Sequence, residues 1–67
     1  MQLTVTSISI RAGETMGRGT GINDDGLRVT FVGDHGPMRY LFEALETGEE
    51  VIVDVPGYAI SKIEDLT

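Results

Sequence analysis

The most regular pattern along the chain is the alternation of apolar and polar residues over residues 27–31, within a predicted strand at residues 27–32. Leu27, Val29 and Phe31 occupy every second position, with polar residues between them. Successive side chains of a strand point to opposite faces, so a period of two predicts a strand with one buried face. Residues 50–55 carry valine at every second position, which predicts another strand.

Residues 2–11 also suggest a strand, but the apolar side of this strand changes along its length. Leu3 and Val5 share one parity, whereas Ile8 and Ile10 share the other. A β-bulge or a sharp bend between the two pairs would bring all four side chains to one face. Small closed barrels use such bends, although a strand buried on both faces would give the same pattern.

Over residues 37–47 the apolar residues recur every three or four positions, which predicts a helix. Pro37 suits its first position because the ring fixes a helical φ and the missing N–H leaves no bond unmade. Gly48 suits the position just after the helix, where a left-handed backbone is common. The apolar residues at i, i+3, i+4 and i+7 form one stripe that should face the rest of the domain: Met38, Leu41, Phe42 and Leu45.

Residues 12–26 contain five glycines. A structureless loop of this length is unusual in so small a domain, so we divide the segment. Residues 15–22 are predicted to be a loose, glycine-weakened strand. Residues 23–26, Asn-Asp-Asp-Gly, predict a turn, because Asn and Asp suit its early positions and glycine takes a positive φ at its end.

The last strand is predicted over residues 58–62. Pro56-Gly57 precedes it and favours turns that suit a tight two-residue hairpin poorly, so a wider connection is expected. Residues 61–64, Ser-Lys-Ile-Glu, also match a capping box, which would produce a closing helical turn.

The predicted segments give the order β-β-β-α-β-β in a single domain, residues 1–67, of the mainly β, small α+β class. This is the order of a small barrel of the oligonucleotide/oligosaccharide-binding (OB) type or an SH3-like type, and the bent first strand favours closure. Without a strand at 15–22, the order becomes β-β-α-β-β, which suits a β-grasp-like sheet. The side chains expected to be buried together are Leu27, Val29, Phe31, Leu41, Phe42, Leu45, Val51, Val53 and Ile60.

The composition is acidic, with five basic and eleven acidic residues and a formal net charge of −6. This charge repels nucleic-acid backbones and anionic lipid. The five basic residues are scattered along the chain, so we expect no nucleic-acid partner and no membrane partner. The absence of cysteine and the single histidine exclude disulfides, thiolate ligands and His-rich metal sites, and no cofactor is expected.

No run of about 18 apolar residues is present, and the first residues lack the pattern of a signal peptide. The sequence therefore predicts a cytoplasmic protein. A chain of 67 residues builds only a small core and has no disulfide or metal to support it. We therefore expect a homo-oligomer.

The sequence offers little catalytic chemistry, and we predict that the protein is not an enzyme. Asp34-His35 is the only acid–imidazole neighbour pair, and no serine lies in the context of a nucleophile elbow. A glycine-rich run could hold a small anion through backbone N–H groups and one arginine, which is the alternative function. Its residues are Gly17, Arg18, Gly19, Thr20 and Gly21.

The outward face of the predicted helix is the leading candidate for a binding surface. Tyr40 points away from the apolar stripe, and Arg39 and Glu43 are placed against the helix dipole. Tyrosine and arginine are enriched at binding hot spots. We therefore predict a non-catalytic module that binds a protein partner, and itself in the homo-oligomer, through Arg39, Tyr40, Glu43, Ala44 and Thr47.

Two segments, residues 33–39 and residues 43–49, resemble short uncharacterised accessory proteins of actinobacterial phages. The resemblance covers about a third of the chain, and these proteins share no assigned activity. It implies a small phage-encoded protein that binds a host factor in the host cytoplasm, and it assigns no functional residue.

Overall fold

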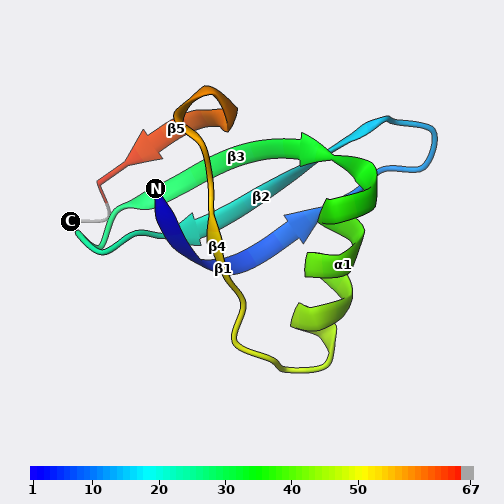
Figure 1. Cartoon of the computed structure of the whole chain (residues 1–67), viewed down its shortest axis with the longest axis horizontal. Helices are drawn as coiled ribbons and strands as arrows, with labels where there is room; N and C mark the ends of the chain where they lie inside the picture. Colours follow the sequence, from blue (N-terminus) through cyan, green and yellow to red (C-terminus); the bar gives the residue numbers. More distant parts are fainter. Residues whose placement is uncertain (66–67) are drawn as a thin grey trace.

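The computed structural model describes residues 1–65, in which five strands and one helix follow the predicted order (Figure 1). The strand at residues 15–22 is present, so the β-grasp-like alternative is wrong. The elements are β1 (Gln2–Ser9), β2 (Met16–Ile22), β3 (Arg28–Asp34), α1 (His35–Glu46), β4 (Ile52–Asp54), the 3₁₀ turn η1 (Gly57–Ala59) and β5 (Ile60–Glu64).

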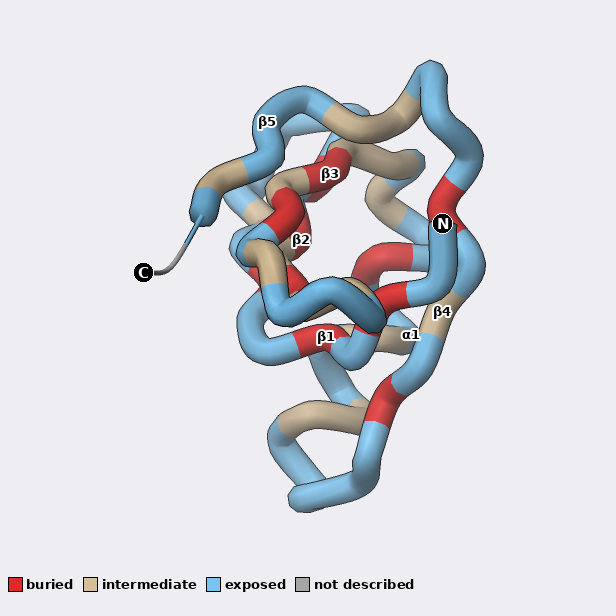
Figure 2. Tube along the Cα trace, turned by 90° about the vertical axis from the view of Figure 1, so that its left-hand side faces the viewer, coloured by how far each residue is buried: buried red, intermediate tan, exposed pale blue. Residues whose placement is uncertain are grey.

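The strands form a single antiparallel sheet with the order β4-β1-β2-β3-β5. Within residues 1–65 no ladder joins β4 to β5, so the expected closed barrel does not form. The sheet is nevertheless strongly curled (Figure 2). The two edge strands are short, and the segment that contains η1 spans the gap between them in place of a ladder (Figure 2). Assignment to an OB-like or SH3-like fold stays a prediction.

The predicted change of face in β1 is confirmed. The register against β2 shifts between Val5 and Ser7, and Ile8 is buried on the same side as Leu3 and Val5. The extra residue bends the strand and increases its twist, which wraps the sheet around the core (Figure 2). The buried side chains are Leu3, Val5, Ile8, Val29, Phe31, Met38, Val51 and Val55.

The central strand β2 contributes only glycines to the core. Gly17, Gly19 and Gly21 are buried, whereas Arg18 between them is exposed. A Cβ at Gly19 would overlap the Phe31 ring, and one at Gly21 would lie 2.8 Å from a backbone oxygen of β1. The glycines therefore leave room for side chains from neighbouring elements, which allows the sheet to curl tightly.

Helix α1 starts two residues earlier than predicted. The β2–β3 ladder continues to Asp34, and the His35 N–H donates a hydrogen bond to the Thr15 carbonyl at 2.9 Å. The chain therefore passes from β3 into the helix without a loop. Pro37 is the third helical residue instead of the first, a position where its missing N–H still removes no intrahelical bond.

The C-terminus of α1 agrees with the prediction. Gly48 follows the C-cap residue Thr47 and has a φ of 82°. Its N–H donates to the Leu45 carbonyl at 3.1 Å, and the Glu49 N–H donates to the Ala44 carbonyl at 3.2 Å. These two bonds make a Schellman motif, which satisfies carbonyls that the helix itself leaves free.

The buried stripe of α1 is narrower than predicted. Met38 is only 2% exposed, and Leu41 and Leu45 are partly buried against the core, but Phe42 is 37% exposed. Phe42 lies at the border of the helix–sheet contact, beside residues 6–8 of β1. The prediction that Phe42 belongs to the core is therefore wrong.

The C-terminal half differs from the prediction mainly in its boundaries. Strand β4 covers three residues, although the alternation over 50–55 is real, since Val51 and Val55 flank it and are buried. Residues 58–62 are divided between η1 and β5, and Ser61 to Glu64 form a strand in place of the helical turn. The wide connection after Pro56-Gly57 is confirmed.

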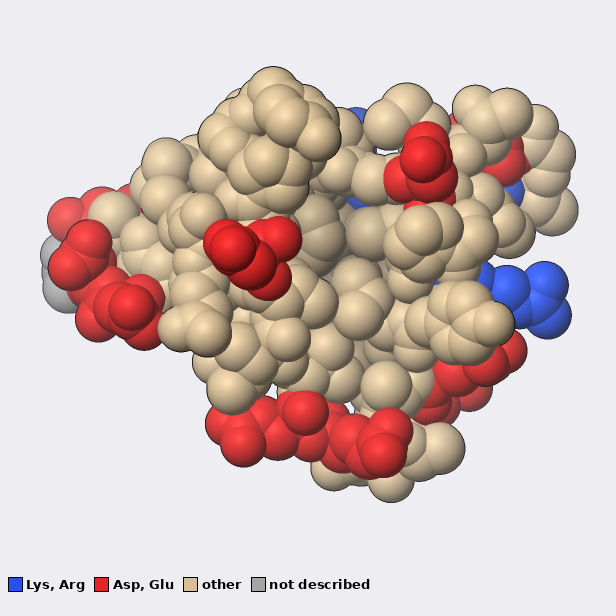
Figure 3. All heavy atoms as spheres, in the orientation of Figure 1, with Lys and Arg blue, Asp and Glu red and all other residues tan. Residues whose placement is uncertain are grey.

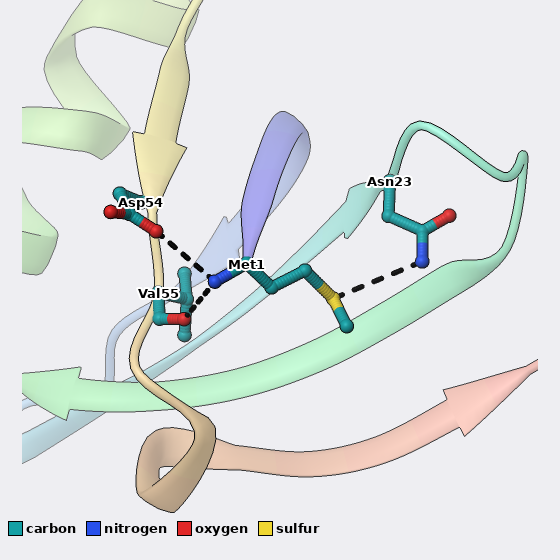
Figure 4. Close-up of polar contacts among 4 residues, drawn as sticks. All are labelled: Met1, Asn23, Asp54 and Val55. Atoms are coloured by element: carbon teal, nitrogen blue, oxygen red, sulfur yellow. Dashed lines mark hydrogen bonds and ion pairs between the residues drawn. The ribbon is translucent and has the colours of Figure 1, made fainter.

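The start of the chain is tied to β4 (Figure 4). The Met1 ammonium group donates to Asp54 Oδ1 at 3.1 Å and to the Val55 carbonyl at 2.8 Å, and the Val55 N–H donates to the Met1 carbonyl at 2.7 Å. The Asn23 side-chain amide contacts Met1 Sδ at 3.8 Å. These contacts extend the β1–β4 pairing to the first residue.

Candidate partner-binding surface

The outer side of α1 presents the exposed tyrosine that the sequence predicted. Tyr40 is 78% exposed and lies in a shallow hollow of about 330 Å³ together with Gly36, Arg39 and Glu43. Arg39 Nε and Glu43 Oε1 are 3.5 Å apart, one turn from each other. These four residues are called the Tyr40 surface below.

Two of the five predicted binding residues lie elsewhere. Ala44 packs against the hydrophobic core. Thr47 ends the helix, and its Oγ1 hydroxyl donates to the Ala44 carbonyl at 2.8 Å. The structure therefore brings together Arg39, Tyr40 and Glu43 but not Ala44 or Thr47.

The charges of α1 do not complement its dipole. Its first turn has no acidic residue and its last turn has no basic residue. The Arg39–Glu43 ion pair is largely exposed on both side chains, so it contributes little to stability. Acidic side chains are spread over the face shown in Figure 3, on which Lys and Arg show clearly only at one edge.

The glycine-rich run is not the anion-binding loop considered from the sequence. Residues 17–21 lie in β2, which is hydrogen-bonded to β1 on one side and to β3 on the other. Its backbone N–H groups are therefore committed to the two ladders and cannot converge on an anion. Of the five residues, only Arg18 and Thr20 point away from the core.

Three of the five basic residues lie on the outward face of the sheet. Arg18 and Arg28 lie on the outward face of β2 and β3, because each has the parity opposite to the buried residues of its strand. Lys62 of β5 is the cross-strand partner of Thr30, which has the same parity as Arg28. Glu64 contacts two of them, Arg28 at 3.3 Å and Lys62 at 3.7 Å. Arg18 and Arg28 lie four residues apart along the β2–β3 ladder, so the expectation that the basic residues form no nucleic-acid surface stays a prediction.

The exposed aromatic residue of η1 was not predicted as a surface feature. Tyr58 was expected in a strand, but it is 93% exposed on the 3₁₀ turn that crosses between β4 and β5. An uncharged protrusion is visible at the position of η1 in Figure 3. Pro56-Gly57 immediately before it was the sequence signal that residue 58 belongs to a turn.

Asp34 and His35 lie at the junction of β3 and α1. Asp34 occupies the N-cap position, and within the described residues its side chain makes no capping hydrogen bond. His35 is the first residue of α1. Among residues 1–65 no group of three His, Asp or Glu side chains is placed to hold a metal ion. In the same part of the chain, no helix is long and apolar enough to cross a membrane.

No model of a protein family, no curated protein and no solved structure matches the chain. The resemblance to phage accessory proteins therefore stays a prediction.

Proposed function

We propose that the protein is a small non-catalytic binding module that acts on a protein partner through the Tyr40 surface. The observation that supports this most directly is the exposure of Tyr40, which leaves 78% of a large aromatic side chain in solvent. Tyrosine and arginine carry binding energy well, because burial of the ring adds apolar contact while the polar groups keep hydrogen-bond partners.

The rigidity of α1 supports the same proposal. Met38 anchors the helix in the core, and the Schellman motif around Gly48 closes its end. A side chain on such an element loses little backbone freedom on binding, which favours affinity. The Arg39–Glu43 pair beside Tyr40 would provide the polar rim of the contact.

A second copy of the chain is a further partner in this proposal. The free edges of β4 and β5 expose Ile52 and Ile63, which are 53% and 49% exposed. Unpaired edge strands favour association with other strands. If the chain is phage-encoded, the partner is a host protein in the host cytoplasm.

Site-specific crosslinking tests the proposal. A photo-crosslinking amino acid is placed at position 40 and, as a matched control, at position 58, which carries the other exposed tyrosine. We expect one discrete crosslinked partner protein from position 40 and none from position 58. A crosslinked dimer from position 58 would instead report association through the neighbouring edges of β4 and β5. Tyr40→Ala should leave the melting temperature unchanged and should abolish capture of the same protein.

Equal crosslinking from both positions, or capture that Tyr40→Ala does not weaken, would contradict the proposal. Sedimentation of the unmodified chain then separates the two kinds of partner. A dimer that Tyr40→Ala dissociates identifies a second copy at the Tyr40 surface, whereas a dimer that persists in this variant associates through the edges of β4 and β5. A monomer with a discrete crosslinked product identifies a different protein.

A further inference from the structure

We propose that the outward face of the β1–β2 hairpin holds a second binding site, which takes the phosphate group of a small phosphomonoester. The site is a hollow of about 290 Å³ lined by Ser9, Arg11, Glu14, Met16, Arg18 and Val32. We call it the arginine hollow. None of its lining residues belongs to the Tyr40 surface of α1, and the inference does not rest on the proposed function.

The strand register brings the groups of the hollow together. Arg18 of β2 lies between Ser9 of β1 and Val32 of β3. Arg11 follows β1 by two residues and lines the same hollow. The hairpin turn between the strands is closed by a hydrogen bond from the Glu14 N–H to the Arg11 carbonyl at 3.2 Å. Two arginines that are seven residues apart in the sequence therefore line one hollow at one end of the sheet.

These two arginines lack the partners that the other basic side chains have. Arg28, Arg39 and Lys62 each contact a carboxylate, at 3.3, 3.5 and 3.7 Å. In the described part of the chain, by contrast, no ion pair or hydrogen bond engages the side chain of Arg11 or Arg18. A chain with eleven acidic and five basic residues thus leaves two guanidiniums free beside one hollow.

The chemistry of the lining defines the class of ligand. A guanidinium presents a rigid fork of donors that matches the oxygens of a phosphate or carboxylate. Two such groups match the charge of about −1.5 to −2 that a phosphomonoester carries at neutral pH better than they match a monoanion. The Ser9 hydroxyl adds a further donor at the same place.

The remaining lining residues limit the ligand. Met16 and Val32 give the hollow an apolar side, which suits a small hydrocarbon portion attached to the phosphate. The Glu14 carboxylate faces the same space and should repel an anion, so it sets an upper limit on affinity. The volume has room for a small organic phosphate but not for a large cofactor.

A titration followed by ¹H–¹⁵N correlation spectra tests the site on the whole chain. Phenyl phosphate, inorganic phosphate and benzoate are compared at constant ionic strength, with sodium chloride as the reference. We expect saturable shifts confined to residues 9–18 and 32 with phenyl phosphate. Its dissociation constant should be on the order of 1 mM or lower. Inorganic phosphate should bind about three- to ten-fold more weakly because it lacks the apolar contact.

Three variants make the test specific. Arg18→Gln should weaken phenyl phosphate binding about ten-fold or more, whereas Arg28→Gln, on the same face but already paired with Glu64, should leave binding unchanged. Glu14→Gln should tighten binding. Tyr40→Ala should have no effect, so failure of this site and failure of the partner-binding surface are distinguishable.

Several results would overturn the proposal. One is a change in chemical shifts that does not saturate with phenyl phosphate and equals the change caused by sodium chloride. Another is an equal loss in Arg18→Gln and Arg28→Gln, which would mean that general surface charge attracts the anion. Benzoate binding as tightly as phenyl phosphate would show that the site does not select a phosphomonoester.

Discussion

The aromatic ring of Phe31 in β3 occupies the space that a side chain of Gly19 in the adjacent strand β2 would fill. The two residues are direct cross-strand partners, and both are buried. The far end of the ring can lie over β2 only because residue 19 lacks a Cβ. The position of the Phe31 ring in the core therefore depends on a glycine at residue 19.

Gly19→Ala should destabilise the domain by about 1–3 kcal/mol, because the added methyl group forces the Phe31 ring to move in a packed core. Gly36→Ala is the matched control: among the described residues a Cβ there meets nothing within 4 Å, and Gly36 lies in α1. The control should be neutral or stabilising by up to about 1 kcal/mol. Urea denaturation of both variants checks this, and equal midpoints would contradict it.

Phe31→Ala and Phe42→Ala should differ strongly in stability. Phe31 is 3% exposed, so its removal should cost about 3–5 kcal/mol. Phe42 is 37% exposed, so its removal should cost less than about 2 kcal/mol. Thermal melting followed by circular dichroism compares the two. A larger loss for Phe42 would mean that the helix packs differently from the structure described above.

Gly48→Ala should cost about 1 kcal/mol, because its φ of 82° lies in the left-handed region that a Cβ disfavours. Gly48→Asn should cost less, since asparagine tolerates this region better. The free energy of unfolding of the three proteins should therefore follow the order Gly, Asn, Ala. An alanine variant as stable as the glycine form would show that the helix end adopts another conformation.

Asp54→Asn should change stability by less than about 0.5 kcal/mol, because the carboxylate that contacts the Met1 ammonium group is 86% exposed. The backbone bonds between Met1 and Val55 remain in this variant. Chemical denaturation at low and high salt measures the effect. A loss above about 1 kcal/mol would show that the ion pair is stronger than an exposed pair usually is.

Features that depend on local chemistry could be predicted from the sequence. The parity change in β1 predicted the bulge, the turn at residues 23–26 forms, and Gly48 takes the expected positive φ. In the turn, the Asn23 side-chain oxygen accepts hydrogen bonds from the N–H groups of Asp25 and Leu27. Each of these features is determined by a few neighbouring residues, which is why the pattern was sufficient.

Features that depend on contacts between distant segments could not be predicted in the same way. Closure of the sheet depends on whether β4 and β5 meet, and the start of α1 depends on the pairing of Asp34 with Met16. The helical period placed Phe42 on the apolar side but could not show where the sheet beneath it ends. The Tyr40 surface was predicted in part, whereas the arginine hollow depends on the strand register.

The glycine face of β2 also affects how this sequence can change over time. Substitutions at the inward positions 17, 19 and 21 meet side chains or backbone at once. Between them, Arg18 is exposed and Thr20 is partly exposed. Surface chemistry on this strand can therefore diverge without a compensating change inside. Related sequences should keep small residues at every second position of this strand, whereas the packing of the core sets no such limit on the outward positions.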